Sequence, residues 1–143
     1  MKKILFFLFL SLSAFLNANE KNNKLADLLH SFGDNGEYAQ MDSVYNLIIH
    51  EDHYKQDKLY ALNITLDYAR FLNQKGDSER ANTLLTQIRE SAMALEKFPE
   101  NTMAHQLQEI AAIATYEIAY GQWQNNQLPA ARETAEEAVS QLE

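Results

Sequence analysis

Two histidines flank two acidic residues at His50-Glu51-Asp52-His53, the densest cluster of possible metal ligands in the 143-residue sequence. Histidines three residues apart on a helix can face one metal ion, but the zinc-protease spacing is four with a glutamate between, and no third ligand accompanies this pair. Histidine is also favoured at the carboxyl end of a helix, where the helix dipole is negative. We therefore expect a helix end on the surface, with a metal site as the alternative.

Other arrangements that support catalysis are missing from the sequence. Asp27 and His30 have a carboxylate–imidazole spacing, but a di-iron bundle needs Glu-x-x-His pairs, which the chain lacks. No serine lies in a Gly-x-Ser-x-Gly elbow, and no glycine-rich loop is present to cradle a phosphate. The absence of cysteine excludes disulfides, thiolate nucleophiles and cysteine-ligated zinc or iron–sulfur sites. We expect neither an enzyme nor a bound cofactor or metal.

An aromatic stripe is the third candidate. Tyr116, Tyr120 and Trp123 follow the i, i+4, i+7 spacing of one helix face. Such side chains either pack against a neighbouring helix as core or offer a partner a large surface with a polar edge. The sequence leaves both interpretations open.

Charge and composition narrow the class of protein. The chain has 20 acidic and 12 basic residues, a formal net charge of -8, and 46% apolar residues, enough for the core of one domain. Its only basic run is Lys2-Lys3, so a nucleic-acid partner is not expected, because neutralising phosphates needs a cationic face. With four glycines and two prolines, the composition predicts an all-α protein.

The amino terminus is typical of a bacterial secretory signal. Lys2 and Lys3 precede an uncharged apolar run over residues 4–16, which is shorter than the ~20 residues that span a bilayer. Ala18 provides the small residue needed before a cleavage site, and Ala14 is the second choice. We expect residues 1–18 to be removed, leaving a periplasmic or secreted domain of residues 19–143 without a stable membrane anchor. The alternative is an uncleaved amino-terminal anchor.

Helical periodicity divides the rest of the chain into six segments, and no segment alternates as a strand would. Turn residues, a polar break at His53 to Asp57 and prolines separate them. Asp77 is expected to cap one helix and Pro129 to begin another. The predicted helices are 20–32, 38–52, 57–75, 78–97, 101–124 and 129–142.

Three of the turns are similar to one another. Each has a residue that tolerates a left-handed backbone, at Gly36, Gly76 and Asn126. A small or slender residue follows five positions later, where two helices would cross closely, at Met41, Ala81 and Ala131.

This pattern resembles the tetratricopeptide repeat, with its best match at Asp67 to Ala81. The resemblance extends over about residues 20–143, although the turns are 40 and 50 residues apart instead of the ~34 of the standard repeat. It implies three antiparallel helix-turn-helix hairpins in a right-handed superhelix that binds protein or peptide. A generic array of six helices is the alternative.

The tetratricopeptide register implies two surfaces. The first helices of the hairpins would form a groove that clamps a partner segment, with the residues His30, Asn63, Arg70, Asn73, Tyr116, Tyr120 and Trp123. The last helix has an apolar stripe that would dock on a partner or on a second copy of the chain, with the residues Ala131, Ala135, Ala138, Val139 and Leu142. The sequence therefore predicts an exported scaffold or assembly factor. The alternative is a small helical bundle that binds a small ligand or a metal.

Overall fold

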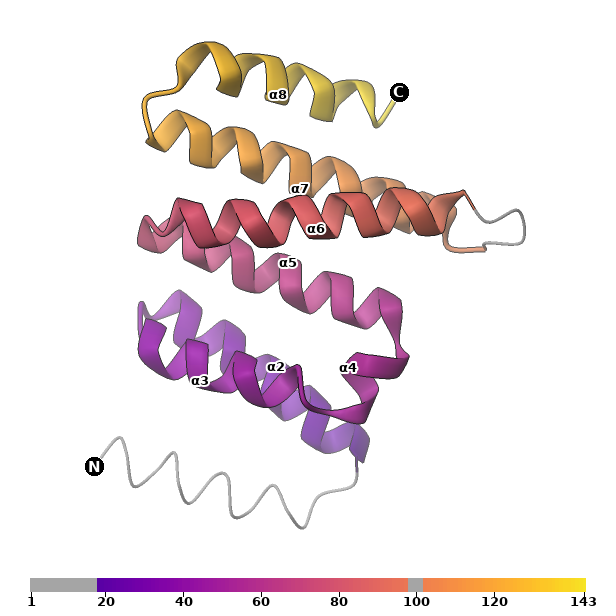
Figure 1. The fold of residues 1–143 in the computed structure, drawn as a ribbon. Helices are drawn as coiled ribbons and strands as arrows, with labels where there is room; N and C mark the ends of the chain where they lie inside the picture. The colour runs from indigo at the N-terminus through magenta and orange to yellow at the C-terminus, as the bar shows by residue number, and fades with distance from the viewer. Residues whose placement is uncertain (1–17, 98–101) are drawn as a thin grey trace.

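The structure is a computed structural model that describes residues 18–97 and 102–143, and this part of the chain is all-α, as the composition predicts. The expected signal segment lies outside the described residues except for Ala18. None of the helices in the described ranges has the length and apolar character of a membrane span. In order along the chain, the described helices are α2 (Ala18–Asp34), α3 (Tyr38–Ile48), α4 (Asp52–Gln56), α5 (Lys58–Lys75), α6 (Ser78–Glu96), α7 (Ala104–Gln124) and α8 (Leu128–Ser140) (Figure 1).

The three similar turns have the same backbone geometry. Gly36, Gly76 and Asn126 have φ values of 69°, 88° and 60° and adopt the left-handed conformation. The amide after each one donates to a carbonyl five residues earlier, at 2.8 to 2.9 Å, the Schellman pattern that ends helices. The donor and acceptor pairs are Glu37 and Phe32, Asp77 and Leu72, and Gln127 and Gln122.

These turns fold the chain into three helical hairpins, which Figure 1 shows stacked along the molecule. The pairs are α2 with α3, α5 with α6, and α7 with α8. The first helices of consecutive hairpins also touch, because α2 contacts α5 and α5 contacts α7. One face of the molecule is therefore formed by α2, α5 and α7.

The predicted helix over 38–52 is interrupted, and the polar break expected at His53 to Asp57 is misplaced. Helix α3 ends at Ile48, and residues 52–56 form the short helix α4. His50 explains the interruption, since its Nδ1 lies 2.6 Å from the carbonyl oxygen of Asn46, the acceptor that its own amide would need to continue the helix. The His50 amide bonds instead to the Leu47 carbonyl at 3.2 Å.

The helix ends differ in how they are capped. Asp57 Oδ1 accepts a hydrogen bond from the Tyr60 amide at 2.9 Å and caps α5. The expected cap by Asp77 is wrong: its side chain accepts no amide and instead contacts Arg80. Pro129 lies in the first turn of α8, as predicted.

The core continues through the stack but changes in character along it. Large residues such as Leu29 and Met41 are fully buried in the first hairpin. Small residues, including Ala81 on α6 and Ala114 on α7, are fully buried where the second and third hairpins meet. The helices α6 and α7 have the most extensive contact in the described chain.

Candidate functional site

Polar side chains bridge the three helices of the α2, α5, α7 face. His30 Nε2 on α2 lies 2.9 Å from Asp67 Oδ2 on α5. Three residues further along α5, Arg70 Nε donates to Glu117 Oε1 on α7 at 3.0 Å. Asn63 is exposed on the same side of α5, one turn before Asp67, and its Nδ2 donates to the Leu59 carbonyl. His30, Asn63 and Arg70 therefore share one surface.

The aromatic stripe on α7 is largely open to solvent. Tyr116 is 57% exposed and Trp123 is 59% exposed, whereas Tyr120 is half-buried with its ring 5.8 Å from that of Trp123. The core side of α7 is occupied by other residues, among them Ile110 and Ala114. The structure therefore excludes a core position for Tyr116 and Trp123.

Glu117, like Asp67, is a residue of this face that the sequence interpretation missed. Its side chain is buried. One carboxylate oxygen accepts a hydrogen bond from Arg70, and the other accepts one from Asn73 Nδ2 at 3.3 Å. A single acidic residue in an apolar stretch of α7 is a signal that could have found it, because a buried carboxylate requires partners. Glu117 fixes the position of the Arg70 guanidinium.

Asn73 corrects the expected groove, because it is only 1% exposed. Its Nδ2 donates to the Glu117 carbonyl at 2.9 Å, and its Oδ1 lies against Gly121 of α7. A helical register identifies the side of α5 on which a residue lies but not how closely the next helix approaches. Asn73 supports the α5–α7 contact and does not line an exposed surface.

The expected docking stripe on α8 is also corrected. Ala131 and Ala138 are buried and Ala135 is half-buried, because α8 packs on α7 of its own chain. The end of this helix is held there by Gln108 Nε2, which donates to the Gln141 carbonyl at 2.6 Å. Only two members of the stripe remain exposed, Val139 and Leu142.

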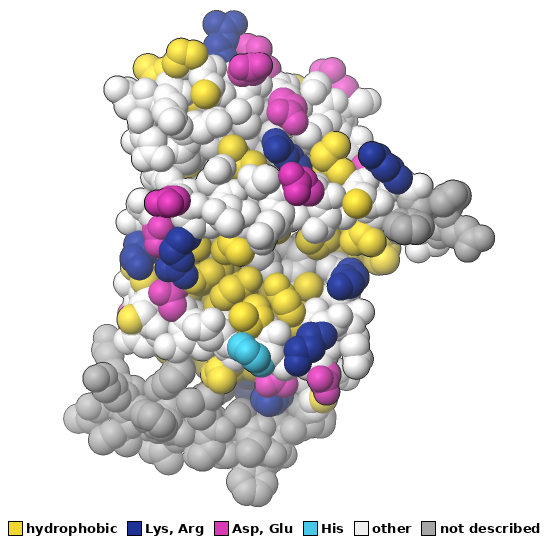
Figure 2. All heavy atoms as spheres, viewed as in Figure 1, with side chains coloured by type: hydrophobic (Ala, Val, Ile, Leu, Met, Phe, Trp, Pro, Cys, Tyr) yellow, Lys and Arg dark blue, Asp and Glu magenta, His cyan; other side chains and the backbone are white. Residues whose placement is uncertain are grey.

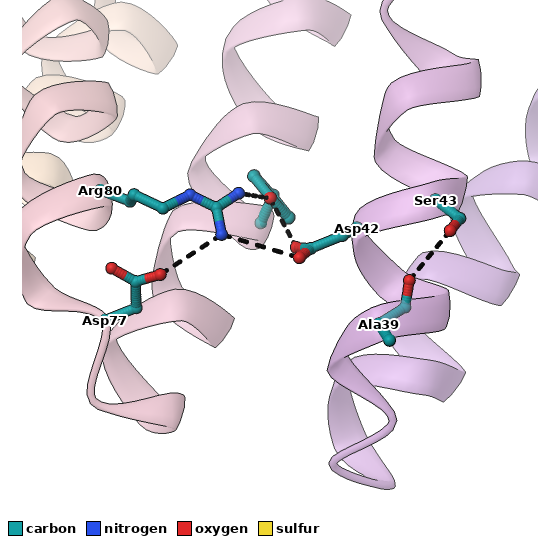
Figure 3. Close-up of polar contacts among 6 residues, drawn as sticks. Ala39, Asp42, Ser43, Asp77 and Arg80 are labelled. Carbon is teal, nitrogen blue, oxygen red and sulfur yellow. Dashed lines mark hydrogen bonds and ion pairs between the residues drawn. The ribbon is translucent and has the colours of Figure 1, made fainter.

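A second polar cluster, which the sequence did not predict, joins the first two hairpins (Figure 3). Tyr68 Oη on α5 donates to Asp42 Oδ1 on α3 at 2.7 Å and accepts from Arg80 of α6. Arg80 Nη1 also lies 3.6 Å from Asp42 and 3.3 Å from Asp77. Burial raises the pKa of Tyr68, and its hydrogen bond to Asp42 adds to the rise. These residues are too far apart in the sequence for spacing to reveal the cluster.

Aromatic rings and hydroxyl groups complete this connection. The rings of Tyr45 and Tyr68 stack with their centroids 3.8 Å apart. The hydroxyl groups of Tyr45 and Tyr54 both contact Thr65 Oγ1, at 3.2 and 2.8 Å. Burial raises the pKa of Tyr45 above its ordinary value. The arrangement connects α3, α4 and α5 through side chains of large volume.

The histidines considered as metal ligands have separate partners. His50 is bonded to the Asn46 carbonyl, whereas His53 Nε2 lies 4.0 Å from Asp57 Oδ2. Asp67, and not Asp27, is the carboxylate that contacts His30. Within residues 18–97 and 102–143, no group of three or more His, Asp or Glu side chains is placed to hold a metal ion.

The α2, α5, α7 face thus carries every residue expected in the groove except Asn73. Its side chains are open aromatic rings, an amide, an imidazole paired with a carboxylate, and a guanidinium held in place from one side. Comparisons of the chain with protein-family models, with curated proteins and with solved structures find no match.

Proposed function

We propose that this chain is an exported, non-enzymatic interaction module, a scaffold or assembly factor that binds a segment of a partner protein on the α2, α5, α7 face. The observation that carries the proposal is the exposure of Tyr116 and Trp123 on a helix whose other side is buried. Tyrosine and tryptophan contribute large contact areas at low cost in side-chain entropy, and they are frequent where partners bind most strongly.

Arg70 supplies the polar contact in this proposal. Its side chain is 50% exposed, whereas the Glu117 side chain that anchors its Nε is 11% exposed. The two Nη groups of Arg70 have no hydrogen-bond partner in the part of the chain that the structure describes. A guanidinium held by one edge and free at the other suits a carboxylate or a main-chain carbonyl of a bound peptide.

The aromatic rings and Arg70 are close enough along α7 to act on one segment. Tyr116 precedes Glu117 by one residue, and Tyr120 follows it by three, within one turn of the helix. The partner should therefore place an apolar side chain over the rings and an acceptor oxygen against Arg70.

Peptides selected from a random display library provide the test, because no partner has to be assumed. We expect selected peptides to shift the emission of Trp123, the single tryptophan of the chain, to shorter wavelength and to reduce its quenching by acrylamide. Tyr116→Ser should abolish binding, and Arg70→Ala should weaken it by about tenfold, the size of one charge-assisted hydrogen bond.

Variants elsewhere on the surface serve as the matched control. Val139→Ser with Leu142→Ser removes two residues of similar exposure from α8 and should leave peptide binding unchanged. Peptides that bind equally well to the Tyr116 and Arg70 variants would contradict the proposed face.

Export is a separate part of the proposal and has its own test. It rests on Lys2 and Lys3 followed by the apolar run at residues 4–16. Amino-terminal sequencing of the protein from its native periplasmic or secreted fraction should begin at Asn19. Protein that begins at Met1 would contradict cleavage.

A further inference from the structure

A groove with an apolar floor opens beside the connection between the first two hairpins. It is lined by α4 and α5 on one side and α6 on the other, and its volume is about 480 Å³. Figure 2 shows apolar side chains gathered in a hollow at the middle of the view. Leu62 and Ile88 are buried at the floor, and the half-buried walls are Ile49, Ala61, Leu84 and Leu95.

Two lysines line the same groove. Lys55 on α4 and Lys58 at the start of α5 are both exposed, and neither forms an ion pair with a described residue. Two of the neighbouring carboxylates have other contacts: Asp57 caps α5, and Glu51 lies 2.8 Å from Lys21 Nζ. Two cations without an ion pair among the described residues therefore lie beside an apolar surface in a chain with a net charge of -8.

We propose that this groove binds a single-chain amphiphile with a carboxylate head, a long-chain fatty acid. The volume lies within the ~300–1,000 Å³ of small-ligand sites, which are mostly apolar with a few polar groups that orient the ligand. The acyl chain would lie along Leu62, Leu84 and Ile88. The carboxylate would lie between Lys55 and Lys58, on the side of these lysines away from the Asp57 cap of α5.

The proposal predicts two dependences of affinity. Each methylene added to the acyl chain should tighten binding about fourfold until the groove is filled, the increment that corresponds to burying one methylene group. Replacing the carboxylate with an uncharged hydroxyl should weaken binding, because the two lysines then have no opposite charge to neutralise.

Calorimetric titration of the protein as it is isolated from the producing cell tests both dependences. The probes are octanoate, decanoate and dodecanoate, each below its micelle concentration, with dodecanol as the uncharged match. We expect one dodecanoate per chain and at least fivefold weaker binding of dodecanol. The variant Lys55→Gln with Lys58→Gln should reduce dodecanoate affinity about fivefold, as expected for the loss of two exposed ion pairs, and leave dodecanol unchanged.

Two further variants control for charge and for folding. Lys24→Gln with Arg132→Gln removes the same charge from positions outside the groove and should not change dodecanoate binding. Ser91→Glu adds a carboxylate at an exposed polar position of the groove, where the fold can tolerate it, and should repel the fatty acid.

Three results would overturn the proposal. The first is equal affinity for dodecanoate and dodecanol, and the second is affinity that neither Ser91→Glu nor the double lysine variant changes. The third is a dimer in light scattering that Ser91→Glu dissociates, since the groove would then be covered by a second copy of the chain. None of these results depends on the peptide-binding face of α2, α5 and α7.

Discussion

The two junctions between the three hairpins are built differently. The first hairpin meets the second through stacked rings, tyrosine hydroxyls and the Arg80 cluster, and a groove lies beside this contact. The second meets the third through alanines, Gly121 and the hydrogen bonds of Arg70 and Asn73 with Glu117, and the contact between α6 and α7 is extensive. Small residues let helix axes approach, whereas large ones hold them apart and leave space at the margin. The second and third hairpins are therefore joined by the more extensive contact, whereas the first hairpin is attached to the second through large rings and polar groups.

Replacing one buried leucine in the first hairpin and one in the second should have different effects on unfolding. Leu85→Ala at α6 and Leu29→Ala at α2 both remove a side chain that is fully buried, at a cost of about 2–5 kcal/mol each. We expect Leu85→Ala to lower the urea midpoint of the whole chain. Leu29→Ala should first abolish amide protection in α2 and α3 while α6 and α7 stay protected, as hydrogen exchange can show. Equal loss of protection in both halves would contradict a difference between the junctions.

Two helical glycines allow the same comparison at a smaller scale. A Cβ added at Gly33 would lie 2.6 Å from the ring of Phe71, whereas one added at Gly121 would lie 3.2 Å from Asn73 Oδ1. Gly33→Ala must displace a buried ring and should cost about 1–2 kcal/mol by overpacking. Gly121→Ala needs a much smaller shift, and the gain in helix propensity should offset most of it. Thermal unfolding of both variants checks the order, and a larger loss for Gly121→Ala would contradict it.

Removing Arg80 tests the polar half of the first junction. Its side chain is 49% exposed, so the loss of its contacts with Asp42 and Asp77 should cost about 1 kcal/mol or less in the free energy of unfolding. Arg132→Ala, which breaks an exposed pair with Glu136, is the matched control and should leave the midpoint unchanged. If Arg80→Ala behaves like the control, the cluster adds nothing to the junction.

A further effect is expected only at alkaline pH, and two tyrosines of the first junction contribute to it. Burial raises the pKa values of Tyr45 and Tyr68 above the ordinary value of about 10. The unfolded chain therefore releases these protons before the folded chain does, so stability is intact below about pH 10 and falls as pH rises further. Tyr45→Phe with Tyr68→Phe should flatten the decline measured between pH 9 and 11. An unchanged slope would show that these groups do not titrate with folding.

The turns and helices were largely predictable because their signals are local. Gly36, Gly76 and Asn126 mark the turns by their tolerance of a left-handed backbone, and the structure confirms each one. The break after Ile48 was not predictable from periodicity, because it depends on one ring, that of His50, reaching a main-chain carbonyl.

The candidate surfaces were less predictable because periodicity shows a face but not what covers it. The alanines of α8 do form a stripe, but α7 of the same chain covers most of it. Asn73 lies on α5 as expected, yet Gly121 lets α7 approach closely enough to bury it. The groove at Lys55 and Lys58 was missed entirely, because it arises from side chains that α4, α5 and α6 bring together.

The three identical Schellman turns bear on where residues can be inserted into such a chain. Each turn ends one helix and starts the next with the same hydrogen bonds, whatever lies between it and the next turn. The unequal spacings of 40 and 50 residues therefore come from the segments between the turns and not from the turns themselves. Insertions within the helical stretches can alter the width of the α2, α5, α7 face while the order of the hairpins is kept.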